Sequence, residues 1–194
     1  MPPAKTANHD GAPPARRRLS KEKWLEQAMS LLEEHGPALM NIDALTSSMD
    51  VTTGSFYHHF KSHGKFLEEL TDKYIQDYTV VVDEHLKTLE LPARDRLIEA
   101  MRQIVTAGLG GRDVHFRALA ISYPHLAGKI RDMDDFRTNL IKGLFEAVGY
   151  RGDELLMRVH AFVVIHSMES AVSTTLKASD RLRLIDERVA LLID

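Results

Sequence analysis

Apolar residues recur every three or four positions along most of this chain, which is the spacing of one helix face. The clearest stripe runs through Leu67, Leu70, Tyr74, Tyr78 and Val81, in steps of 3, 4, 4 and 3 residues. It includes the β-branched run at residues 79–82, so we expect a helix there despite a composition that favours a strand. The sequence contains no β-hairpin pattern. The fold class is therefore predicted to be all-α.

Glycine and proline divide this helical pattern into segments. We expect helices to begin after Ser20, Asn41 and Thr52, because each of these residues can cap a helix N-terminus. A fourth helix is expected at about residues 65–89. The remaining predicted helices lie at about residues 94–107, 114–123, 132–148, 153–176 and 179–193. The glycine-rich run at residues 108–111 is predicted to be a break between helices.

Residues 1–19 differ in composition from the rest, since they hold four of the seven prolines and the run Arg16, Arg17 and Arg18. We expect a flexible basic arm. No apolar segment follows its basic cluster, so a secretory signal is not expected and the protein is predicted to be cytoplasmic. The most apolar later run, residues 155–172, is interrupted by charged residues and is predicted to be a buried helix, not a membrane span.

Several kinds of chemistry are excluded by what the sequence lacks. The chain of 194 residues contains no cysteine, which excludes disulfides, thiolate nucleophiles and cysteine-bound metals. It has no nucleophile elbow, no His-Glu-x-x-His and no P-loop. His160 and His166 are six positions apart and do not share a helix face that could chelate a metal. We predict that the protein is not an enzyme and has no cofactor or metal site.

An acid-free stretch follows the second predicted helix. Residues 51–67 contain no Asp or Glu but include two lysines and three histidines. A surface that faces phosphate must lack anions. The net charge of the whole chain is −3, so such a surface has to arise from local segregation of charge. Three short helices with a tight turn between the last two are typical of a helix-turn-helix domain, whose second helix enters the major groove of DNA.

The residues of the third predicted helix make this interpretation more specific. The run VTTGSFYHHF at residues 51–60, preceded by Asn41, Ile42 and Leu45 and by Ala28 with Gly36, resembles the N-terminal domain of tetracycline-repressor (TetR) family regulators. The resemblance covers about residues 20–67. It implies a DNA-binding head at residues 20–65 and an all-helical body at residues 66–194 that binds an effector and dimerises. Three positions depart from the family pattern, which commonly has Gly at Asp50, Ala at Thr46 and Lys at His63.

The resemblance also assigns roles in the head. It implies that Thr53, Gly54, Ser55 and His58 reach base edges or their backbone, and that Tyr57 and His59 bind phosphate. The full set of candidate DNA-binding residues is Thr52, Thr53, Gly54, Ser55, Tyr57, His58, His59, Lys61, His63, Lys65, Arg16, Arg17 and Arg18. The alternatives are a helix-packing role for Gly54, solvated surface histidines, and a basic arm that only aids solubility. Phe56 and Phe60 are assigned to the core of the head.

In the body, residues 155–172 are apolar nearly all the way round and need partners on every side. We expect this helix and the last one to pair with their copies as a four-helix dimer interface, with a purely internal core helix as the alternative. The candidate interface residues are Leu156, Val159, Val163, Ile165, Val189 and Leu192. The candidate effector-pocket residues, for which core packing is the alternative, are Tyr74, Tyr78, Phe116, Tyr123, Met133, Met157, His160 and Phe162.

Two functions remain open on these grounds. The resemblance implies a ligand-responsive transcriptional regulator, a repressor that binds a palindromic DNA operator as a homodimer and is released by a small-molecule effector. The alternative is a DNA-bound architectural or cell-division factor of the same fold without an effector. If an effector acts, the predicted helix at residues 65–89 is expected to link its pocket to the head.

Overall fold

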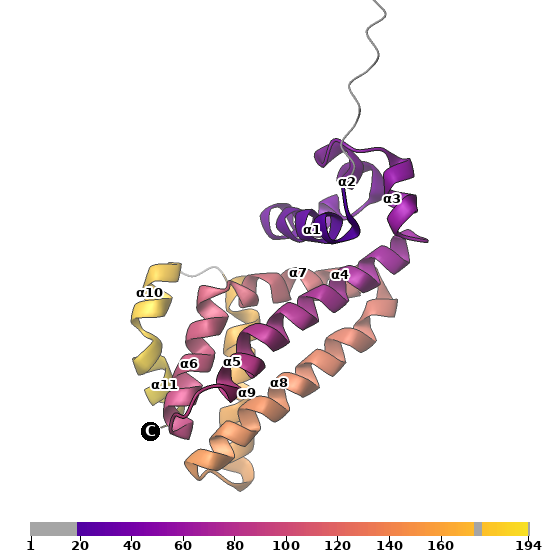
Figure 1. The fold of residues 1–194 in the computed structure, drawn as a ribbon. Coiled ribbons are helices and arrows are strands. Elements are labelled where there is room, and N and C mark those ends of the chain that lie inside the picture. The colour runs from indigo at the N-terminus through magenta and orange to yellow at the C-terminus, as the bar shows by residue number, and fades with distance from the viewer. Residues whose placement is uncertain (1–18, 173–175, 194) are drawn as a thin grey trace, which may run out of the picture.

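The computed structural model describes residues 19–172 and 176–193, and helices are the only regular elements within those ranges (Figure 1). The predicted all-α class is therefore confirmed. The head contains α1 (Lys21–His35), η1 (Gly36–Leu39), α2 (Ile42–Ser48) and α3 (Thr53–His59). The body contains α4 (His63–Tyr78), η2 (Thr79–Glu84), α5 (His85–Lys87), α6 (Ala93–Thr106), α7 (Leu109–Ser122), η3 (Pro124–Leu126), α8 (Ala127–Val148), α9 (Gly152–Met168), η4 (Glu169–Ala171), α10 (Ala178–Arg183) and α11 (Ile185–Ile193). Arg16, Arg17 and Arg18 lie outside the described residues.

Short polar side chains begin the first helices as the sequence predicted. Ser20, Asn41 and Thr52 each accept a hydrogen bond from the backbone N–H three residues later, at 3.2, 2.9 and 3.1 Å. Each bond satisfies one of the donors that a helix N-terminus leaves without an internal partner. Ser62 caps α4 in the same way, at 3.1 Å. These caps fix where the turns of the head begin and end.

The two unusual residues near the turn of the head are accommodated locally. Asp50 has a φ of 51°, a left-handed conformation that Asp tolerates better than most side chains. Thr46 is buried, and its hydroxyl donates to the carbonyl of Ile42 at 2.8 Å. Both departures from the family pattern are therefore compatible with a helix-turn-helix geometry.

Four aromatic rings hold the head together and attach it to α4. Trp24, Phe56, Phe60 and Phe66 are all buried, which confirms the core assignment of Phe56 and Phe60. Trp24 and Phe56 meet edge to face with ring centroids 5.6 Å apart, and Phe56 and Phe66 are 5.4 Å apart. Because Phe66 belongs to α4, the first turn of that helix is part of the head's core.

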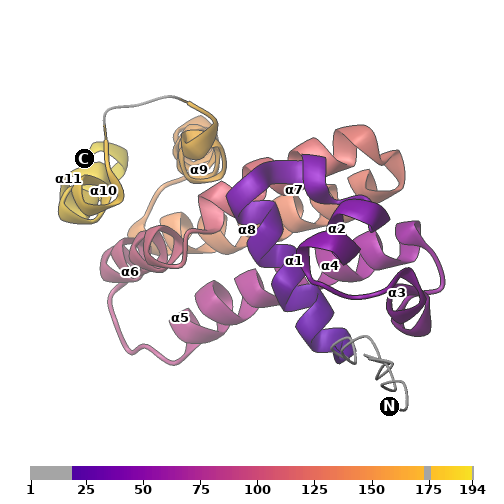
Figure 2. The same ribbon diagram turned by 90° about the horizontal axis from the view of Figure 1, so that it is seen from above.

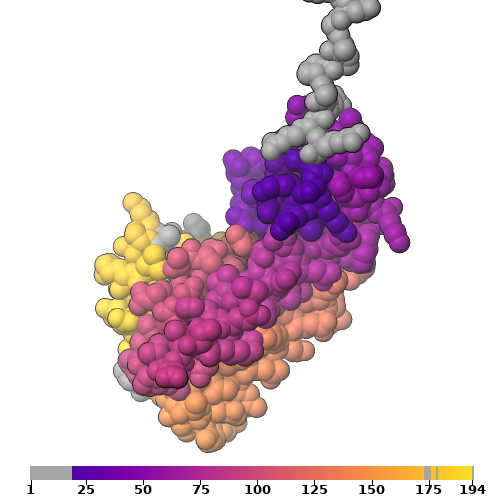
Figure 3. All heavy atoms as spheres, viewed as in Figure 1, coloured from indigo at the N-terminus to yellow at the C-terminus, as the bar shows by residue number. Residues whose placement is uncertain are grey.

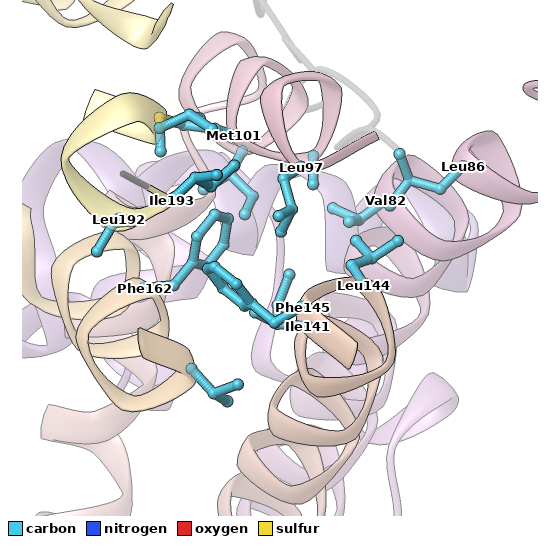
Figure 4. Close-up of a cluster of buried hydrophobic side chains, with 14 of the residues drawn as sticks. Val82, Leu86, Leu97, Met101, Ile141, Leu144, Phe145, Phe162, Leu192 and Ile193 are labelled. Atoms are coloured by element: carbon cyan, nitrogen blue, oxygen red, sulfur yellow. The ribbon is translucent and has the colours of Figure 1, made fainter. Parts of the chain in front are cut away.

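A second core lies at the other end of α4. Its side chains come from the segment after α4 and from α6, α8, α9 and α11, with Phe145 and Phe162 packed edge to face at its centre (Figure 4). The head rests against the body over α4 (Figure 3). Seen from above, α10 and α11 lie at the end of the molecule farthest from α3 (Figure 2).

Several predicted helix boundaries require correction. The helix predicted at residues 65–89 forms, but its β-branched run adopts the π-helical turn η2. The break at residues 108–111 reduces to Gly108, whose φ is 65°, and α7 begins at Leu109, with Gly110 and Gly111 in its first turn. The helix expected at residues 153–176 ends at Met168, and the last one is divided at Leu184. No helix among the described residues is long and apolar enough to cross a membrane.

Candidate nucleic-acid interface and body cavity

One face of α3 is open to solvent while the opposite face is held in the core. Thr52, Thr53, Gly54 and His58 are exposed, and Tyr57 keeps 54% of its surface accessible. Ser55 is half-buried. No acidic residue lies in the first turn of α3, so its positive N-terminal end is not neutralised by a neighbour on the same helix. This face offers hydroxyl, imidazole and phenol groups to a partner with acceptor and donor groups.

Gly54 has no packing role inside the head. A Cβ built on it would contact only the hydroxyl oxygen of its neighbour Thr52, at 3.7 Å, which is an ordinary van der Waals distance. The alternative of a helix-packing glycine therefore finds no support among the described residues. A side chain here would instead fill the space through which a partner could approach the α3 backbone.

His59 joins α3 to the start of α1. Its Nε2 lies 2.7 Å from the carbonyl oxygen of Leu19, to which the ring N–H donates. Leu19 is itself buried. The candidate phosphate-binding residue His59 thus also has a structural role, since it holds the entry to α1 against the C-terminal end of α3.

His63 is turned inward, which corrects its predicted place among the DNA contacts. Its Nε2 lies 2.5 Å from the carbonyl oxygen of Met40, and its ring meets Tyr123 with centroids 5.4 Å apart. The side chain therefore links α4 to the turn before α2 and to the end of α7. Lys61 is exposed. Lys65 is also exposed but bonds Glu68 at 3.0 Å, and this hydrogen bond raises the pKa of the lysine.

The predicted effector-pocket residues do not line one cavity. Tyr74 stacks on Phe116 with ring centroids 4.3 Å apart, and both are fully buried. Met133 and Phe162 belong to the body core, and Tyr123 packs against the cluster that contains the head's aromatic core. Two residues of α9 were placed wrongly, because Met157 is 65% exposed and His160 is also exposed. A helix that is apolar on several sides gives no sequence signal for which side faces inward.

A buried polar cluster that the sequence analysis missed lies beside Tyr74 and Tyr78. The hydroxyl of Tyr74 donates to Oδ1 of Asp113 at 2.7 Å, and Arg137 pairs with the same oxygen at 2.9 Å. Arg137 also donates to the hydroxyl of Ser167 at 3.2 Å and lies over the ring of Tyr78. Burial raises the pKa of Tyr78 to about 12. Charged residues on amphipathic helices usually face water, so nothing in the pattern distinguished this pair.

The body contains a hollow of about 240 Å³ between α6, the start of α7, the end of α9 and α10. Its lining residues are Ile104, Val105, Gly108, Gly110, Gly111, His166, Glu169, Ser170 and Arg181. A void of about 10 Å³ adjoins the hollow and shares the lining residues Ile104, Gly110 and His166. Tyr78 also lines this void. Burial lowers the pKa of His166 to about 4. Of the residues predicted for a pocket, Tyr78 alone touches either space.

The predicted dimer residues divide into two groups. Leu156 and Ile165 are exposed on α9 by 60% and 39%, together with Met157, Val164 and Met168. Val163 is half-buried. In contrast, Val159, Val189 and Leu192 are buried in the chain's own core, so these three cannot lie on an exposed face. The apolar surface of α9 is thus narrower than predicted. Leu191 on α11 is also exposed, with 83% of its surface accessible.

The head consists of three short helices, and the last of them, α3, has an exposed face. One long helix, α4, connects this head to an all-helical body. This arrangement defines a helix-turn-helix protein. Residues 25–70 match the sequence model of the family described as bacterial regulatory proteins, tetR family. The family resemblance found in the sequence is thereby confirmed, and the chain carries the DNA-binding head and the fold of TetR-family transcriptional regulators. A search of curated proteins finds no match.

Solved structures share the fold over nearly the whole chain. A transcriptional regulator from Rhodococcus sp. Rha1 is 15% identical and superimposes with a TM-score of 0.73, covering 90% of this chain and 96% of that chain. AibR, solved in complex with isovaleryl coenzyme A and operator DNA, is 14% identical, with a TM-score of 0.68 and coverages of 89% and 97%. The ketosteroid transcriptional regulator KstR2 of Mycobacterium tuberculosis is 15% identical, with a TM-score of 0.68 and coverages of 89% and 92%.

Proposed function

We propose that this protein is a ligand-responsive transcriptional repressor that binds a palindromic DNA operator as a homodimer. The observation that carries the proposal is the two-faced α3. Phe56 fixes one face of this helix in the aromatic core, while Thr53, Tyr57 and His58 are exposed on an acid-free helix. A rigid, short helix with polar groups on its open face is what major-groove recognition requires.

The individual residues suit the two kinds of DNA contact, those to base edges and those to phosphates. The hydroxyls of Thr53 and Ser55 and the ring of His58 offer donors and acceptors to base edges. Tyr57 rests its ring edge to face on Phe56, with centroids 5.3 Å apart, which supports the phenol while its hydroxyl reaches a phosphate. Gly54 leaves room for the α3 backbone to approach the duplex. Lys61 is exposed and supplies positive charge near α3, and we propose Lys65, Arg16, Arg17 and Arg18 as further phosphate contacts.

A second copy of the chain is needed to read a palindrome. The exposed apolar side chains Leu156, Val164 and Ile165 on α9 and Leu191 on α11 supply a surface that a partner copy would cover. Such a dimer would carry two α3 helices, which must stand about 34–36 Å apart to enter successive major grooves. The DNA-bound protein would then reside with the chromosome in the cytoplasm.

The hollow in the body favours the ligand-responsive function over the architectural alternative. It is lined by helices of the body, and α7 runs from it to the head. The fold neighbour AibR is described in complex with both a small molecule and operator DNA, which supports the same pairing of sites here. The wall of the hollow also includes Nε2 of His166, a buried nitrogen without a hydrogen-bond partner among the described residues, which a bound effector could satisfy.

Selection of duplexes from a random library by the full chain tests the proposal. We expect enrichment of a palindrome whose half-sites are centred about one helical turn, or a multiple of it, apart. Enriched DNA should then be released by a small molecule that binds the body. Recovery of no sequence beyond salt-sensitive, non-specific binding would contradict the DNA-binding role. Specific binding that no small molecule relieves would favour the architectural alternative.

A further inference from the structure

The wall of the hollow includes the N-terminal end of α7. Gly108 begins this helix with a left-handed φ and, having no side chain, gives it no side-chain cap. The first backbone N–H groups of a helix lack internal partners and carry partial positive charge. Gly110 and Gly111 add no side chain at this end, and both residues line the hollow. Such an end can receive an acceptor or an anion.

His166 provides an independent sign of a ligand at the same place. His166 is buried, with 5% of its surface accessible, and the residue lines both the hollow and the adjoining void. Its Nδ1 lies 2.6 Å from the carbonyl oxygen of Phe162 on its own helix and donates to it. Nε2 has no hydrogen-bond partner among the described residues. An unpaired buried polar atom costs free energy unless something else satisfies it.

The charged groups at the hollow leave a positive excess. The carboxylate of Glu169 lies 2.6 Å from Arg188 and 3.9 Å from Arg181. Arg188 already balances Glu169, so the charge of Arg181 is left over at the mouth of the hollow. The Nε atom of Arg181 also lacks a hydrogen-bond partner among the residues described. Asp113 and Arg137 neutralise each other on the void side of His166.

We propose that this hollow binds a small monocarboxylic acid, with its carboxyl group between the start of α7, Arg181 and Nε2 of His166, and its alkyl chain along Ile104 and Val105. This rests on the ligand-responsive function proposed above and names the class of ligand. One carboxyl oxygen accepts from the N–H groups of Leu109 and Gly110, because those of Gly111 and Arg112 already donate to the carbonyl of Gly108. The other carboxyl oxygen shares a proton with Nε2. The alkyl chain covers the apolar side of the hollow, which a fully hydrophilic anion would leave unfilled.

The proton balance gives the site a distinctive signature. His166 is neutral in the empty protein near neutral pH, because burial lowers its pKa more than the hydrogen bond to the carbonyl of Phe162 raises it. A carboxylate arriving from neutral water is also without its proton. One proton is therefore taken up from solvent when the carboxylate binds, and it lies between the carboxyl oxygen and Nε2. Binding should consequently weaken as the pH rises.

α7 connects this site directly to the head. Arg112, one turn into the helix, forms an ion pair with Glu33 of α1. His115 contacts the position of Gly36 in η1, where an added Cβ would be 3.6 Å from Nδ1 of the histidine. At the far end, Tyr123 meets His63. A ligand that prefers a shifted first turn of α7 therefore favours a different position of the head, and thereby changes its fit to the operator.

Isothermal titration calorimetry on the full chain tests the ligand class, with hexanoate as the probe and hexanamide as its neutral isostere. We expect hexanoate to bind with a dissociation constant of about 1 mM or tighter. Comparing two buffers with different ionisation enthalpies should show uptake of about one proton per site. Hexanamide should bind at least about tenfold more weakly and take up no proton.

Three variants distinguish the loss of ligand contacts from a general loss of folding. His166→Gln should abolish the proton uptake and weaken hexanoate at least about tenfold. His160→Gln is the matched control on the same helix, and it should bind like the wild type. Arg181→Gln changes a partly exposed residue and should also weaken hexanoate, which keeps the test valid if His166→Gln does not fold.

Several results would overturn the inference. These are absence of hexanoate binding to the wild type, equal binding of hexanoate and hexanamide, or unchanged proton uptake in His166→Gln. The outcome for DNA is read separately. If the selected operator is bound but released only by neutral molecules, the carboxylate site is wrong and the proposed function stands. If hexanoate binds as expected but no DNA sequence is selected, the site stands and the proposed function fails.

Discussion

Gly110 of α7 lies so close to α9 that a Cβ on it would stand 2.6 Å from the backbone carbonyl oxygen of His166. The backbones of the two helices therefore meet here without a side chain between them. Glycine is required at this position by the close approach, because its backbone is helical and has no unusual φ. The contact places the first turn of α7 against the carbonyl of His166 at the wall of the hollow.

Gly110→Ala should destabilise the protein by about 1–3 kcal/mol, because the new methyl group would collide with a backbone atom that cannot rotate away. The matched control is Gly143→Ala in α8, where a Cβ would meet no heavy atom within 4 Å. That change should stabilise the helix by up to about 1 kcal/mol. Urea unfolding of both variants measures the difference. Equal stability of the two would show that α7 and α9 are not packed so closely.

His166 should make the stability of the protein depend on pH. Burial lowers its pKa to about 4 in the folded chain, from an ordinary value of 6.5. Between these values the unfolded chain binds a proton at this residue and the folded chain does not, so the free energy of unfolding falls as the pH decreases. The contribution lost between pH ~7.5 and pH ~5 is about 2 kcal/mol.

Urea unfolding at these two pH values checks the prediction, with His166→Leu as the comparison. The wild type should lose about 2 kcal/mol more than the variant on acidification. The same loss in both proteins would mean that His166 titrates normally in the folded state.

The exposed apolar side of α9 should hold two copies together. Ile165→Glu places a charge in this surface and should give monomers in sedimentation velocity, because an unpaired charge cannot be buried in an interface. Ile121→Glu is the control, since Ile121 is 83% exposed on α7 and is not part of the α9 and α11 surface. It should leave the dimer intact. A dimer that persists in Ile165→Glu would contradict this interface.

His63 should act through stability and not through phosphate. His63→Ala leaves the carbonyl of Met40 without its donor and should cost about 1–2 kcal/mol of unfolding free energy. The salt dependence of DNA binding should stay unchanged. Lys61→Ala should do the reverse, with unchanged stability and a salt slope smaller by about 0.9. A smaller salt slope in His63→Ala would contradict this account and would show that His63 contacts phosphate, as the family's lysine position implies.

The parts of this structure that the sequence predicted are those fixed by local chemistry. Ser20, Asn41 and Thr52 begin helices because a capping side chain needs only its own backbone three residues later. The position of Phe56 in the core follows from helical spacing in the same short segment. The predicted surface of α3 has the same origin, since residues that alternate with buried ones on a short helix have to face outward.

The parts that the sequence did not predict depend on contacts between distant segments. His63 was predicted to bind phosphate because it occupies the position of the family's lysine, whereas its actual partner, the carbonyl of Met40, lies 23 residues away and has no sequence signature. The hollow was missed because its wall combines a glycine-rich turn with His166 from another helix. The buried and exposed sides of α9 could not be told apart in the sequence, because both sides of that helix are apolar. Val159 was therefore predicted on the surface although it is buried, and Met157 in a pocket although it is exposed.

DNA recognition by α3 is tested most directly by a fluorescence-anisotropy titration of the selected duplex at fixed salt, together with its single-base variants. Tyr57→Phe should weaken binding to every duplex by a similar factor of about three to ten, because it removes one phosphate contact and no base contact. Ser55→Ala should alter the preference at one base position and leave the others unchanged. Ser122→Ala, an exposed serine at the end of α7, should bind every duplex like the wild type. If the two α3 variants also bind every duplex like the wild type, α3 is not the recognition helix.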